Sequence, residues 1–121
     1  MTFADSDLAA LAEVEEIKIE THAADGTVRR TIVWPLVRDG VVYVRSYHGP
    51  AGRWYQEALA DPVIALDVEG RRLAAHALPA SDAESVEACS AALRDKYPRS
   101  YSLEAMLVPD VLPTTMRVVP A

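Results

Sequence analysis

The stretch RRTIVWPLVRDGVVYVRS, residues 29–46, contains two predicted β-strands joined by an Asp39-Gly40 turn. Asp-Gly is typical of a two-residue hairpin turn, because both positions accept a positive φ. In this register Trp34 lies opposite Arg45, and the alternating positions on both faces are apolar. A barrel interior can bury only one of the two faces. The other face must be covered by a helix or by a second copy of the chain.

The segments on either side of this hairpin predict more strands and three helices. Alternating apolar residues and glycine turns predict strands at 14–22, 62–70, 71–80 and 114–120. Helices are expected over about 7–13, 53–61 and 81–97, the last with a capping box that begins at Ser81. The chain is expected to be one domain, residues 1–121, with a loosely attached helix within residues 1–13. The expected fold is mostly β with α: a six-stranded antiparallel sheet that curls or closes, with one long helix and one or two short helices.

Composition and charge exclude several classes of protein. The chain has 121 residues, a formal net charge of −6 and an estimated pI of 4.9. Its basic residues are too few and too scattered for a nucleic-acid groove. No apolar run approaches the ~18 to 20 residues of a membrane helix, and the acidic N-terminus does not resemble a secretory signal. With a single cysteine, Cys89, and no metal-ligand spacing among its histidines, the sequence predicts a cytoplasmic protein without a metal site, a nucleic-acid partner or a membrane partner.

The end of the hairpin has the composition of an anion-binding loop. Arg45 and Ser46 end a strand, a Gly-Pro-Ala-Gly loop follows, and Arg53 begins the next helix. Two guanidinium groups, a hydroxyl and a helix N-terminus are suited to a phosphate. Other interpretations remain open: Arg45 can stack on Trp34 and point to water. His48, within the loop, can contact a ligand, donate a proton or be a surface histidine.

The same segments carry a resemblance to a known superfamily. The order of elements, the hairpin quoted above and the loop and helix GPAGRWYQEALADP resemble the split-barrel flavin-binding proteins. That superfamily includes pyridoxamine-phosphate-oxidase-like proteins and deazaflavin-dependent nitroreductases. The resemblance spans about Glu16 to Pro120, and its tail pattern matches Lys96, Tyr97, Met106 and Pro109.

The resemblance implies a cofactor, FMN or a deazaflavin, at the interface of a homodimer. Residues flanking its ring system would be Arg30, Thr31 and Trp34. The residues around its phosphate would be Arg45, Ser46 and Arg53, together with Gly52 and Trp54 of the same loop and helix.

The predicted function is therefore that of a small homodimeric oxidoreductase. It would transfer a hydride to or from an organic small-molecule substrate, with the redox chemistry supplied by the cofactor. No catalytic acid or base can be named from the sequence. The alternative is a non-catalytic or cofactor-free small barrel that binds a small acidic ligand.

Overall fold

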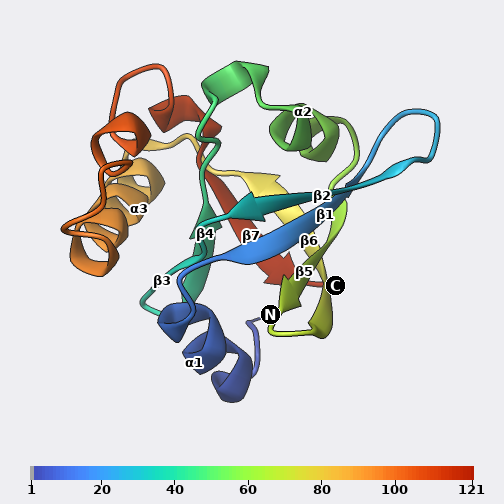
Figure 1. The fold of residues 1–121 in the computed structure, drawn as a ribbon, viewed down its shortest axis with the longest axis horizontal. Coiled ribbons are helices and arrows are strands. Elements are labelled where there is room, and N and C mark those ends of the chain that lie inside the picture. Colours follow the sequence, from blue (N-terminus) through green and yellow to red (C-terminus); the bar gives the residue numbers. More distant parts are fainter. Residues whose placement is uncertain (1) are drawn as a thin grey trace.

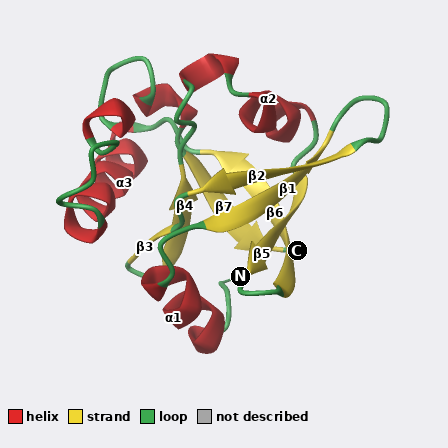
Figure 2. Ribbon diagram, viewed as in Figure 1, coloured by secondary structure: helices red, strands yellow, loops and turns green. Residues whose placement is uncertain are grey.

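The computed structural model describes residues 2–121. It contains one seven-stranded sheet in which all neighbouring strands are antiparallel. The strand order is β2 (Val28–Val33), β1 (Ile17–His22), β5 (Val63–Val68), β6 (Arg71–Pro79), β7 (Met116–Pro120), β4 (Val41–Val44) and β3 (Leu36–Arg38). The helices α1 (Asp5–Glu13), α2 (Arg53–Ala60) and α3 (Ala83–Lys96) surround this sheet (Figure 1). In Figure 2, a long segment without strands connects α3 to β7.

The two edge strands of the sheet are consecutive in the sequence. Only Trp34 and Pro35 separate β2 from β3, although these strands lie at opposite ends of the strand order. Each residue of an extended chain spans at most roughly 3.6 Å. The sheet must therefore curl until its two edges meet at Trp34 and Pro35, which makes it a half-open barrel.

The prediction of six strands is wrong. The single strand expected before the Asp39-Gly40 turn is divided into β2 and β3. Pro35 has no N–H group to donate to a ladder. Pairing with β1 therefore ends at Val33, and pairing with β4 begins at Leu36. The turn that follows is confirmed: Asp39 and Gly40 have φ values of 52° and 77°.

The chain buries both faces of the β3–β4 hairpin. Val42 and Val44 lie in the barrel interior, whereas Leu36 and Tyr43 face α3 and pack with Cys89, Leu93 and Tyr97 of its apolar side. At this end of the sheet, α3 therefore covers the face that does not point into the barrel interior. At the other end, no helix within residues 2–121 covers the outer face of strands β2, β1, β5 and β6 (Figure 1).

One local prediction about the helices is corrected. The N-cap of α3 is Asp82 and not Ser81, since the Asp82 carboxylate accepts a hydrogen bond of 3.0 Å from the Ser85 amide. Leu11 of α1 and the preceding Phe3 are buried in the barrel core. Within the described residues, no helix is long and apolar enough to cross a bilayer.

Candidate functional site

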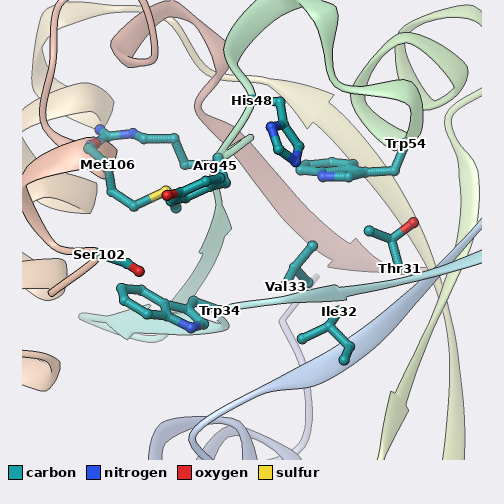
Figure 3. Close-up of a pocket in the computed structure, with 10 residues that line it drawn as sticks. Thr31, Ile32, Val33, Trp34, Arg45, His48, Trp54, Ser102 and Met106 are labelled. Atoms are coloured by element: carbon teal, nitrogen blue, oxygen red, sulfur yellow. The ribbon is translucent and has the colours of Figure 1, made fainter. Parts of the chain in front are cut away.

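An aromatic hollow of about 260 Å³ lies where the edge of the sheet meets the loop before α2. We call it the aromatic pocket. In Figure 3, Trp34 lies on one side of it, and His48 and Trp54 lie on the opposite side. The remaining lining comes from three segments of the chain: Thr31, Ile32, Val33, Arg45, Tyr47, Ser102 and Met106. Two facing groups of aromatic rings suit a flat, conjugated ligand.

The Trp34 ring packs against the C-terminal end of α3. Its ring stacks on Tyr97, with 4.0 Å between centroids and 17° between planes. The Tyr97 hydroxyl donates a hydrogen bond of 2.7 Å to the Glu15 carbonyl, and burial raises the pKa of Tyr97. The Lys96 ammonium donates to the Pro35 carbonyl at 2.6 Å, and burial lowers its pKa to about 8. The Lys-Tyr pair therefore fixes the position of one wall of the pocket.

The structure separates Arg30 from the other residues expected around a ring. Thr31 and Trp34 line the aromatic pocket, but Arg30 lies on the opposite face of β2, as strand alternation requires. There it donates to Glu20 at 3.1 Å, and Arg72 donates to the same carboxylate at 2.7 Å. The hydrogen bond from Arg72 is the main cause that holds the pKa of Glu20 below its ordinary value. Arg30 is thus part of a charged cluster on the outer face of the sheet.

Arg45 points into the protein and not into the anion loop. Its side chain is 1% exposed, and burial lowers its pKa. The guanidinium donates to four neutral acceptors on three separate segments: Thr115 Oγ1, Ser90 Oγ, the Met106 carbonyl and the Val86 carbonyl, at 2.9 to 3.0 Å. It therefore ties α3 and the segments after it to β4, and it reaches the aromatic pocket only as part of the wall.

Ser46 is also engaged in internal contacts. Its hydroxyl donates to the Gly49 carbonyl at 2.7 Å, and its amide donates to Thr114 Oγ1 at 3.1 Å. A Cβ at Gly52 would come within 2.2 Å of the Ser46 oxygen, so this close approach requires glycine at position 52. Ser46 and Gly52 shape the loop instead of contributing free donors to it.

A second hollow adjoins the aromatic pocket and has a basic end. We call it the basic hollow; its volume is about 510 Å³, and it shares Thr31, His48 and Trp54 with the aromatic pocket. Arg29, Gly52 and Arg53 also line it. Arg29 is paired with Glu57 at 2.9 Å, whereas Arg53 is exposed and has no carboxylate within 4.0 Å among residues 2–121.

The donors around Arg53 fit one anionic group. Arg53 is the first residue of α2, where the backbone N–H groups have no partners within the helix. The helix dipole favours negative charge at the same place. Of the residues predicted to hold a phosphate, Arg53 is the one whose charge remains available for a ligand.

Several residues of the site escaped sequence reasoning. Ser102 reaches the pocket from the segment after α3, and no local pattern points to it. Met106 carries a signal, since it belongs to the tail pattern of the resembling proteins. Tyr47, in the predicted loop, is also missed. His48 of the same loop, which the sequence offers as a possible ligand contact, lines the pocket together with Trp54. Among residues 2–121 no group of histidine, cysteine and acidic side chains is arranged to hold a metal ion.

The fold is a split barrel, and solved structures of low sequence identity share it. Three solved structures show this likeness. A pyridoxamine 5′-phosphate oxidase-like protein from Listeria innocua is 15% identical, with a TM-score of 0.69 over 96% of this chain and 91% of that one. An F420-H2-dependent reductase is 15% identical, with a TM-score of 0.65 over 86% of this chain and 93% of that one. The haem storage protein HutZ from Vibrio cholerae is 12% identical, with a TM-score of 0.66 over 100% and 92%.

The chain belongs to the family DUF2255, described as uncharacterized proteins conserved in bacteria. The family model matches residues 7–118, which is nearly the whole chain. No curated protein sequence matches the chain.

Proposed function

We propose that the chain binds FMN or a deazaflavin and acts as an oxidoreductase on an organic small molecule. The observation that carries this proposal is the continuity of the two hollows. The aromatic pocket suits a flat ring, and the adjoining basic hollow suits the charged tail of the same ligand. The likeness to an F420-H2-dependent reductase and to a pyridoxamine 5′-phosphate oxidase-like protein supports a ligand of this type.

Each part of the site has a separate task in this proposal. Trp34 and Trp54 pack against the ring, and the Thr31 hydroxyl offers a hydrogen bond at its edge. Arg53 and the first amides of α2 bind the phosphate or the acidic tail. The bound cofactor would supply the hydride chemistry, while the protein contributes position and polarity.

A titration tests the proposal. Purified protein is titrated with FMN and, separately, with coenzyme F420, and binding is followed by fluorescence. We expect micromolar binding of one of the two, and an affinity about tenfold lower in Arg53→Gln, since a charge-assisted hydrogen bond contributes roughly 1.5 kcal/mol or more. Arg99→Gln is the matched control, because Arg99 is also exposed but lines none of the hollows. Absence of binding to both cofactors would overturn the proposal.

A ligand-carrying barrel without catalysis is the second candidate, and His48 favours it. Its imidazole is exposed at the aromatic pocket and forms no hydrogen bond within residues 2–121. A free imidazole is a common ligand of haem iron, and haem carries two carboxylates for a basic hollow. HutZ and a mycobacterial haem-binding protein have this fold. A Soret band that appears with haem and disappears in His48→Ala, without any flavin binding, would establish this candidate over the first.

We also propose that the protein is a homodimer, formed through the outer face that no helix covers. Exposed apolar residues on this face are Val28, Ile32 and Val63, around the Glu20 cluster with Arg30 and Arg72. Exposed apolar residues gathered on one face are typical of an interaction site. Ile32 also lines the aromatic pocket, so a second copy bound here would lie close to the ligand.

Sedimentation equilibrium tests the dimer. The wild-type chain is expected at twice its monomer mass, and Val63→Glu is expected to shift the equilibrium toward monomer by placing a carboxylate in the interface. Leu59→Glu on α2 is the control, since Leu59 is comparably exposed but lies away from this face. A wild-type chain that stays monomeric at high concentration would contradict the proposal.

A further inference from the structure

A third hollow lies beside the aromatic pocket, and none of the proposals above uses it. It has a volume of about 780 Å³ and lies between the loop before α2 and the segment before β7. We call it the proline groove, because its lining includes Pro50, Pro109 and Pro113 with Val108 and Val111. It shares Tyr47 and His48 with the aromatic pocket, so the two hollows are continuous.

The two walls of the groove are held together by buried hydrogen bonds. The Ser46 amide donates to Thr114 Oγ1, and that hydroxyl donates to the Val111 carbonyl at 2.6 Å. Gly49, which also lines the groove, has a φ of +66° and lies close to the Asp110 backbone. These contacts fix the separation of the walls, so the groove exists before any ligand binds.

The charge of the groove differs from that of the basic hollow. Asp110 is the one charged residue among the groove's lining, and no lysine or arginine lines it. The basic hollow, by contrast, has two arginines. An anion entering the groove would lose water and meet a carboxylate, which is unfavourable. Proline, valine and alanine side chains favour an uncharged, apolar ligand.

His48 stands where the three hollows meet. It lines the aromatic pocket, the basic hollow and the proline groove. Its ring lies edge-on to Tyr47, with 5.2 Å between centroids and 87° between planes, and both ring nitrogens lack hydrogen-bond partners within the described chain. An imidazole N–H here can donate to a carbonyl oxygen of a ligand that lies in the groove.

We propose that the proline groove binds an uncharged, apolar carbonyl compound, with its carbonyl oxygen hydrogen-bonded to His48. If the proposed function holds, this second ligand is the substrate, placed next to the cofactor ring. Only the identification of this ligand as the substrate rests on the proposed function. Binding to the groove is a property of this chain's own residues and can be measured without cofactor.

A pair of probes that differ in charge tests the groove. Binding of 1,4-naphthoquinone and of 1,4-naphthoquinone-2-sulfonate to the full chain is measured by quenching of tryptophan fluorescence. We expect the neutral quinone to bind about tenfold or more tightly than the sulfonate, and Asp110→Asn to reduce this difference. Equal affinities for the two probes would overturn the proposal.

Three variants locate the probe. His48→Leu removes the donor and is expected to weaken quinone binding about three- to tenfold. Val108→Asp places a carboxylate on the wall of the groove and is expected to weaken it about tenfold or more, while Leu59→Asp serves as the control for an added surface charge. Unchanged quinone binding in Val108→Asp would overturn the proposal, as would a loss caused by Arg53→Gln, since the probe would then occupy the other hollows.

The cofactor titration, run on the same proteins, separates the two proposals. Quinone binding without binding of FMN or F420 supports the groove and refutes the proposed cofactor. Cofactor binding without quinone binding does the reverse.

Discussion

Arg45 shows how one residue can satisfy a sequence pattern and yet have another role. An arginine and a serine before a glycine loop are typical of an anion site. In the folded chain the guanidinium instead donates to two hydroxyls and two carbonyls inside the protein. Because it holds Met106, it shapes the aromatic pocket without offering its charge to a ligand.

This role predicts a loss of stability in Arg45→Met. The substitution leaves several buried oxygens without a donor, so the free energy of unfolding should fall by about 3 kcal/mol. The measurement is urea unfolding followed by circular dichroism. Arg99→Met, on the surface, should stay within roughly 0.5 kcal/mol of the wild type. Unchanged stability in Arg45→Met, together with lost cofactor binding, would mean that Arg45 binds the ligand and does not stabilise the fold.

At the scale of elements, the C-terminal end of α3 stabilises the bend between β2 and β3, where the two edges of the sheet meet. Lys96 donates to the Leu11 carbonyl in the last turn of α1 and to Pro35 at the bend between β2 and β3. A cation is favourable at the C-terminal end of a helix. Tyr97 stacks on Trp34 next to the same bend. One helix end therefore positions α1, the bend and a wall of the aromatic pocket.

Lys96 also predicts a pH dependence of stability. Burial lowers its pKa from 10.5 to about 8 in the folded protein. Between these two values the unfolded chain binds more protons than the folded chain, so the free energy of unfolding rises with pH. We expect the stability of the wild type relative to Lys96→Met to increase from pH 8 to pH 10, measured by urea unfolding. A difference that stays constant or decreases over this window would contradict the lowered pKa.

At the scale of the whole molecule, the two cores share the β3–β4 hairpin. Alternate residues of these strands enter the barrel interior and the layer under α3. Each core has its own tryptophan: Trp54 packs in the barrel interior, and Trp34 packs against the layer under α3. Neither core can lose its part of the hairpin without disturbing the other.

This arrangement predicts a single unfolding transition. In Trp34→Phe the remaining Trp54 reports on the barrel, and in Trp54→Phe the remaining Trp34 reports on the α3 layer. For each variant we expect the urea midpoint by fluorescence to coincide with its own midpoint by far-ultraviolet circular dichroism. Separate midpoints in either variant would mean that the two cores unfold independently.

The sequence predicts the elements well and the site only in part. Periodic apolar residues and Asp-Gly turns indicate the hairpins, since these signals are local. The number of strands is missed because Pro35 divides an apolar run that reads as one strand. The site is missed in part because polar side chains at a strand end can turn inward or outward, and local sequence does not distinguish the two. Arg45 and Ser46 turn inward, Arg30 lies on the other face, and Arg53 remains exposed.

What the sequence determines by itself is the alternation that makes both faces of the β3–β4 hairpin apolar, and hence the need for two covers. The tertiary structure alone decides what those covers are and which arginine stays available. The reason is that hydrogen-bond acceptors for a buried guanidinium come from α3, the segment around Met106 and the start of β7, which are far from Arg45 in the chain. Their meeting at one point depends on how the sheet curls, and no stretch of sequence contains that information.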